Sequence, residues 1–250
     1  MYIELIGVPG SGKSTLTNYL MKEHSSIYKW EKIKPKVVYE YAVKYGLYLN
    51  YWKRFTLRMP IIKSYTTNYY LMKNIKFSPQ SYKNLWGKVV NNVIKAIDNN
   101  EYMTNQMIPH YISWEMEKIV RAQMCMDFCR ENKVDVIMDE GVLTSLSTVS
   151  NQDMLSYRDI LPDAAIFLNT PIDIVAERLI QRRKKQINLL FEKMSDQEVF
   201  EYISSINKRY QTMVIQLKKM HIPVLEYNIE ENSLAEVGDK LSCLLETHKE

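Results

Sequence analysis

The chain has 250 residues, of which 46% are hydrophobic and 25% are charged, and its formal net charge is +4. These values are typical of a globular protein with a sizeable core, and they exclude a disordered or fibrous chain. The sequence contains no run of about eighteen apolar residues and no leader-like start, so we expect neither a transmembrane segment nor secretion. Three cysteines, an odd number, favour reduced thiols and a cytoplasmic protein.

Glycine and charge are both distributed unevenly. Three of the seven glycines, Gly7, Gly10 and Gly12, fall within six consecutive residues. Residues 29–88 hold thirteen lysines and arginines against two glutamates, a local net charge of +11, which leaves −7 for the rest of the chain. The sequence therefore combines a mildly acidic scaffold with one strongly basic segment.

The glycine cluster forms a phosphate-binding motif. Apolar residues 2–6 predict a strand, and the apolar spacing from Leu16 onward predicts a helix. The sequence between them fits G-x-x-x-x-G-K-[ST], the P-loop, in which backbone N–H groups and a helix N-terminus surround phosphate oxygens. We expect Lys13 to contact the β- and γ-phosphates and Ser14 to bind Mg²⁺. The predicted nucleotide-binding residues here are Gly7, Pro9, Gly10, Ser11, Gly12, Lys13, Ser14 and Thr15.

Later segments extend this unit into an α/β fold. Residues 134–138, 164–168 and 223–227 predict buried strands, and residues 112–131 and 198–218 predict amphipathic helices. Strands alternating with helices indicate a central parallel sheet covered on both faces, here a P-loop NTPase three-layer sandwich. We expect a single domain over 1–250 with a large, basic and aromatic-rich helical insertion at about 24–111.

Two acidic residues follow the strand predicted at 134–138. Asp139 occupies the position where P-loop enzymes keep an acidic residue that orients Mg²⁺. A residue of this type is also common as a helix cap or in a turn. Glu140 either accepts the proton of an attacking hydroxyl or points to solvent. Asp139 and Glu140 are therefore candidate catalytic residues, and Asp139 and Ser14 are the candidate metal ligands.

Several segments resemble P-loop kinases of the nucleoside monophosphate kinase group, most closely thymidylate kinase. The resemblance rests on the P-loop, on Arg121-Ala-Gln123 before a strand that ends at Asp139, on residues 161–171 and 176–183, and on residues 222–228. It implies phosphoryl transfer from ATP with Mg²⁺ and places Arg121 near the acceptor. It also implies that Arg178, Arg182 or Arg183 closes over the phosphates, with Arg182 our candidate catalytic arginine, and that Asn228 lies near the nucleotide base. A solvated basic cluster is the alternative for these arginines.

One departure bears on the acceptor. Thymidylate kinases have Asp-Arg where this chain has Asp139-Glu140, so an anion replaces a cation that would meet an acceptor phosphate. A neutral hydroxyl activated by a carboxylate becomes plausible, as in sugar or nucleoside kinases. We therefore expect an anionic or hydroxyl-bearing small-molecule acceptor.

The basic segment holds an aromatic and apolar stripe at helical spacing from Tyr41 to Ile62, with Pro60 near its end. Such a stripe is most often a packing surface, but Arg54 and Arg58 beside it are candidate substrate-binding residues. We read the segment as a substrate cap. The alternative is a nucleic-acid- or polyanion-binding P-loop ATPase that uses this surface. A regulatory module without turnover is a weaker alternative, and homodimer formation stays open.

Overall fold

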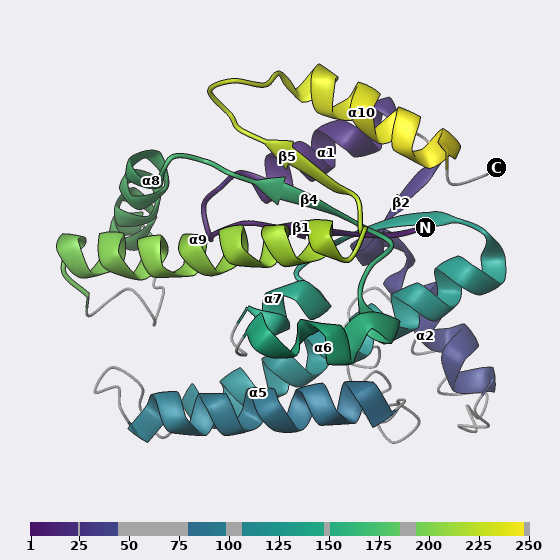
Figure 1. The fold of residues 1–250 in the computed structure, drawn as a ribbon, viewed down its shortest axis with the longest axis horizontal. Helices are drawn as coiled ribbons and strands as arrows, with labels where there is room; N and C mark the ends of the chain where they lie inside the picture. The colour runs from purple at the N-terminus through teal and green to yellow at the C-terminus, as the bar shows by residue number, and fades with distance from the viewer. Residues whose placement is uncertain (25, 45–79, 99–106, 148–150, 186–193, 248–250) are drawn as a thin grey trace.

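A computed structural model of the chain describes residues 1–24, 26–44, 80–98, 107–147, 151–185 and 194–247 (Figure 1). Its centre is a five-stranded sheet in the order β2-β3-β1-β4-β5, and all four neighbouring pairs are parallel. The strands are β1 (Tyr2–Ile6), β2 (Ile27–Lys29), β3 (Asp135–Asp139), β4 (Ala164–Leu168) and β5 (Val224–Tyr227). The connection after β1 leads to β2 on one side of the sheet, and the connection after β4 leads to β5 on the other side. Ligands bind in such sheets at the carboxyl ends of neighbouring strands whose connections diverge in this way.

Helices cover both faces of this sheet, because successive strand residues point to opposite faces. Ile3 and Leu5 pack against α1 (Lys13–Glu23) and α10 (Leu234–Thr247). Tyr2 and Ile6 face the larger core on the other side, visible below the strands in Figure 1. The elements of that side are α2 (Trp30–Lys44), α5 (Gln80–Asp98), α6 (Met107–Asn132), α7 (Val142–Leu146), the 3₁₀ helix η2 (Asn151–Ile160), α8 (Ile172–Lys185) and α9 (Asp196–Lys219).

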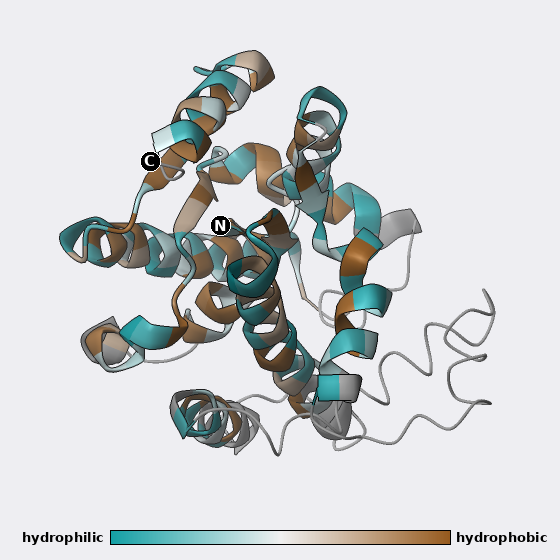
Figure 2. Cartoon of the chain, turned by 90° about the vertical axis from the view of Figure 1, so that its right-hand side faces the viewer, coloured by the Kyte–Doolittle hydropathy of each residue, from teal (hydrophilic) through white to brown (hydrophobic). Residues whose placement is uncertain are grey.

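The fold class predicted from the sequence is confirmed. Four predicted strands match β1, β3, β4 and β5 within a residue at each end, and the two predicted helices match α6 and α9. Figure 2 shows hydrophobic and hydrophilic bands alternating along the helices, as expected where one helix face packs on a core. Cys125 and Cys129, one turn apart on α6, are buried free thiols.

One strand was missed. Ile27–Lys29, within the segment predicted as a helical insertion, forms the edge strand β2 beside β3. Three residues are too few to show an alternating pattern, and an edge strand has only one neighbour to bury it. The sheet therefore extends into the predicted insertion, and α2 begins directly after β2.

The rest of the basic segment is described only in part. Tyr41 of the predicted stripe is buried, and its hydroxyl donates to Asp127 at 3.0 Å and accepts from Gln123. At this position the stripe is a packing surface. Arg54, Arg58 and the remaining stripe residues lie outside the described residues. Within the described ranges, no helix combines the length and the apolar composition needed to cross a membrane.

Candidate active site

The P-loop connects β1 to α1 at the carboxyl edge of the sheet. Gly10 and Gly12 have φ of +86° and +100°, a left-handed conformation that side chains rarely adopt, so these two positions require glycine. The Ser11 amide donates to the Val8 carbonyl at 3.1 Å, and Thr170 Oγ1, just beyond β4, donates to the Ser11 carbonyl at 2.8 Å. The loop is thus anchored both within itself and to the neighbouring strand.

Lys13 folds back over this loop. Its ammonium donates to the carbonyls of Gly7 and Val8 at 2.7 and 3.2 Å. Burial lowers the pKa of Lys13, while the carboxylates of Asp139 and Glu140 act in the opposite direction. The predicted phosphate-binding lysine and the two predicted acidic residues therefore lie within electrostatic reach of one another.

Asp139 ends β3, and its Cα is paired with that of Leu5 in β1, close to where the P-loop begins. Burial raises the pKa of Asp139, while Lys13 opposes the shift. Asp139 Oδ1 is buried without a hydrogen-bond partner among the described residues. A buried acceptor oxygen beside a phosphate-binding loop fits a hard cation such as Mg²⁺, which prefers oxygen ligands. Ser14, the other predicted ligand, is exposed at the start of α1.

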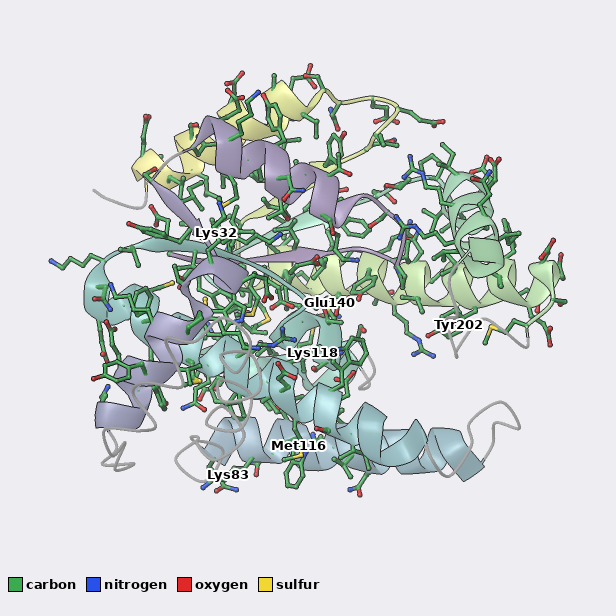
Figure 3. The ribbon with its side chains drawn as sticks, turned by 180° about the vertical axis from the view of Figure 1, so that it is seen from behind. Lys32, Lys83, Met116, Lys118, Glu140 and Tyr202 are labelled. Atoms are coloured by element: carbon green, nitrogen blue, oxygen red, sulfur yellow. The ribbon has the colours of Figure 1, made fainter. Side chains whose placement is uncertain are left out.

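Glu140 follows in a left-handed conformation with φ of +62°, which costs a non-glycine residue roughly 1–2 kcal/mol. Figure 3 shows Glu140 between the strands above it and α6 below it, where Lys118 and Met116 are labelled. Glu140 is half-buried, so the structure does not leave it in open solvent.

Gly141 follows Asp139 and Glu140 in a closely packed turn, so we expect a larger side chain there to lower stability. A Cβ at this position would overlap with the Tyr2 hydroxyl and would lie 2.8 Å from Glu4 Oε2. We expect Gly141→Ala to lower the free energy of unfolding by roughly 1–3 kcal/mol, measured by urea denaturation.

Gly87→Ala in α5 is the matched control. A Cβ at Gly87 meets no heavy atom of the described residues within 4 Å. Because alanine favours a helix, we expect Gly87→Ala to raise stability by up to about 1 kcal/mol. Equal unfolding midpoints for Gly141→Ala and the wild type would contradict the close packing of this turn.

The sequence did not identify Glu31 as a site residue. It lies in the first turn of α2, directly after β2, and its charge acts on Asp139. Arg121, predicted near the acceptor, is buried on α6 with its Nη1 3.6 Å from Glu31 Oε1 and its Nε 3.9 Å from Glu117 Oε1. The predicted acceptor arginine therefore already faces two carboxylates.

A second buried cation on α6 is also paired. Lys118 forms an ion pair with Glu115, and both side chains are only 1% exposed. Ser145 of α7 donates to Glu115 Oε2 at 2.9 Å, and the Lys118 ammonium lies 3.9 Å from the ring centre of Trp114. The i, i+3 spacing of Glu115 and Lys118 allows a pair on one helix, but the contact with Ser145 of α7 depends on tertiary packing that the spacing does not reveal.

The arginines predicted to close over the phosphates differ in their distance from the P-loop. Arg178 Nη1 donates to the Gly10 carbonyl at 3.2 Å. Burial raises the pKa of Tyr227, at the end of β5, and the positive charge of Arg178 opposes that shift. Arg182, one turn later on α8, is exposed, and the side chain of Arg183 lies outside the described residues. Of the predicted arginines whose side chains the structure describes, Arg178 is the one that lies at the P-loop.

Asn228 lies directly after β5 on the same edge of the sheet. Its side-chain Oδ1 accepts from the Glu230 amide, and its own amide donates to Asn232 Oδ1, both at 3.1 Å. Asn228 therefore shapes the turn that leads toward α10. Its predicted proximity to a nucleotide base stays a prediction.

Comparison with known proteins gives similarity of fold only. No protein-family model matches the chain, and no curated protein matches it. Among solved structures, deoxyadenosine kinase from M. mycoides with bound dCTP is 14% identical, with a TM-score of 0.44 over 98% of both chains. The same enzyme with bound dATP is 14% identical, with a TM-score of 0.40 over 98% of this chain and 100% of that one. The narrower resemblance to thymidylate kinase stays a prediction.

Proposed function

We propose that this protein transfers the γ-phosphoryl group of ATP to a hydroxyl group of a small molecule, with Mg²⁺ as cofactor. The observation that carries the proposal is the position of Lys13, in the P-loop, within electrostatic reach of the carboxylates of Asp139 and Glu140. A cation on the phosphates facing carboxylates that can hold a metal ion or accept a proton is the arrangement that phosphoryl transfer requires.

Backbone amides, Lys13 and arginines of α8 would bind the phosphates of ATP. The amides of residues 10–15 surround the phosphate oxygens, and the Lys13 ammonium exchanges its contacts with the Gly7 and Val8 carbonyls for phosphate oxygens. Arg178, already at the Gly10 carbonyl, adds positive charge beside the loop, and Arg182 lies one turn farther along α8. Positive charge around the transferred group stabilises the transition state.

Asp139 and Ser14 would hold the magnesium ion. The unpartnered Oδ1 of Asp139 and the hydroxyl of Ser14, at the start of α1, are oxygen ligands of the kind that Mg²⁺ selects. When bound, the ion neutralises charge on the phosphates.

The acceptor is inferred to be a neutral hydroxyl compound. The two buried cations of α6, Lys118 and Arg121, are each opposed by carboxylates. An acceptor phosphate would have to displace those carboxylates and approach Glu140. A hydroxyl needs only a carboxylate that accepts its proton, and Glu140, Asp139 and Glu31 are the candidates. The hydroxyl oxygen then attacks the γ-phosphorus, its proton passes to the carboxylate, and ADP leaves.

A screen of acceptors tests this function. We expect ATP consumption to be stimulated by uncharged hydroxyl compounds, with nucleosides, sugars and nucleoside monophosphates compared at equal concentration and the phosphorylated product identified by mass spectrometry. ATP hydrolysis stimulated by oligonucleotides, without a phosphorylated product, would favour the polyanion-binding ATPase. Turnover confined to monophosphates would contradict the neutral acceptor while leaving phosphoryl transfer in place.

A further inference from the structure

Glu4 is a buried carboxylate at the centre of the sheet. It lies in β1, its Cα is paired with that of Met138 in β3, and its exposed fraction is 0%. None of the ion pairs formed among the described residues includes it. A buried charge without a cationic partner is costly unless hydrogen bonds stabilise it, so its partners need an explanation.

The partners of Glu4 are four donors, three of which are backbone amides of a single turn. Oε1 accepts from the amides of Gly141 and Thr144 at 2.8 and 3.1 Å. Oε2 accepts from the Leu143 amide at 3.1 Å and from the Tyr2 hydroxyl at 2.9 Å. The three amides belong to the start of α7, whose N-cap residue, Gly141, has no side chain to cap them. The Glu4 carboxylate, on strand β1, therefore caps the start of helix α7.

This contact fixes the turn that carries Asp139 and Glu140. On one side of the turn, Asp139 is held in the sheet beside Leu5. On the other side, the amides of Gly141, Leu143 and Thr144 are held by Glu4. Glu140 lies between these anchors with its φ of +62°, a conformation that persists only where the surroundings impose it.

The same strand also leads directly into the P-loop. Glu4 is three residues before Gly7, so β1 determines both where the phosphates would lie and where the two carboxylates lie. We propose that Glu4 is a positioning residue, which holds the Asp139–Glu140 turn in register with the P-loop so that metal and nucleotide bind in the reactive arrangement. Its catalytic consequence rests on the proposed phosphoryl transfer, whereas the fixing of the turn does not.

The test uses Glu4→Gln, which keeps the size of the side chain but replaces one acceptor oxygen with a donor group. In one orientation the amide group faces the backbone amides of Gly141 and Thr144, and in the other it faces the Leu143 amide and the Tyr2 hydroxyl, which can turn to accept. At least one backbone amide therefore loses its acceptor in either orientation. We expect hydrogen exchange of the amides at 141, 143 and 144 to speed up roughly tenfold or more, without a similar change in α10. The Mg²⁺ concentration for half-maximal rate should rise and kcat should fall roughly tenfold, while the KM for ATP stays within about twofold.

Two further variants separate positioning from general destabilisation. Asp135→Asn alters another buried carboxylate, at the opposite end of β3, where Asp135 pairs with the N-terminal ammonium. We expect it to lower the unfolding temperature without changing exchange at 141–144 or the Mg²⁺ dependence. Tyr2→Phe removes only one donor to Glu4, and a smaller acceleration of the same amides, roughly two- to fivefold, is expected. It is the variant to use if Glu4→Gln does not fold.

The outcomes distinguish this proposal from the proposed function. Unchanged exchange at 141–144 in Glu4→Gln, or in Tyr2→Phe if Glu4→Gln does not fold, would overturn the positioning role whatever the activity. A wild-type protein that phosphorylates no acceptor would overturn the proposed function. In that case the exchange rates, and the Mg²⁺ concentration needed for ATP binding, still decide whether Glu4 fixes the turn.

Discussion

Lys13→Ala is expected to reduce acceptor-dependent ATP turnover by at least roughly 10²- to 10³-fold. The Lys13 ammonium is the cation that the structure holds in the P-loop, at the Gly7 and Val8 carbonyls. Removing it leaves the β- and γ-phosphates without that charge both in the bound state and in the transition state. Coupled measurement of ADP formation gives the rate, and calorimetric titration with ATP gives the accompanying loss of affinity.

Lys22→Ala is the matched control for this variant. Lys22 lies on the same helix, in its last turn, and is exposed, so its removal should leave turnover unchanged. Circular dichroism should show that both variants keep the wild-type helix content. More than a tenth of the wild-type rate in folded Lys13→Ala protein would contradict the proposed mechanism.

The second large effect is expected at the carboxylates near Lys13. Asp139→Asn should lower kcat roughly 10²-fold and raise the Mg²⁺ requirement, because an amide oxygen is a weaker ligand than the carboxylate oxygen that now lacks a partner. One carboxylate is proposed to accept the proton of the acceptor's hydroxyl group. Replacing that residue by the corresponding amide should lower kcat roughly 10²- to 10⁴-fold, with little change in Mg²⁺ dependence.

Glu140→Gln and Glu31→Gln distinguish the two other candidates for the base. Both side chains lie within electrostatic reach of Asp139, Glu140 on the turn after β3 and Glu31 at the start of α2. We expect only one of them to show the large loss, and Glu23→Gln, at the exposed end of α1, to behave as the wild type. Near-normal rates for both would leave proton transfer to Asp139 or to the substrate itself.

The parts of the fold that the sequence predicted are those defined by local pattern. The P-loop is fixed by its own spacing, and buried parallel strands such as Ala164–Leu168 read as continuous apolar runs. The edge strand β2 was missed, because three residues beside a single neighbour leave no pattern that a sequence can show. Asp139 could be named as a candidate because it follows a recognisable strand.

The remaining site residues depend on tertiary packing. Glu31 follows the strand that was missed, so its approach to Asp139 had no local sign. Arg178 and Arg182 share one helix face in sequence, and only the path of the P-loop decides that Arg178 reaches Gly10. Glu4 looks like an isolated polar residue in an apolar strand, and the three backbone amides that it binds lie about 140 residues away along the chain.

The central position of β1 in the sheet also has a consequence for folding. The first strand of the chain has both of its neighbours, β3 and β4, beyond residue 134, and Gly7 packs against Leu168. Contacts between such distant segments form slowly, since a long loop must close before they contribute stability. During synthesis, the P-loop sequence leaves the ribosome before β3 and β4 do, and its binding geometry can assemble only after β4 has emerged. The nucleotide affinity that the proposed function requires would therefore be a late property of folding, acquired with the whole sheet.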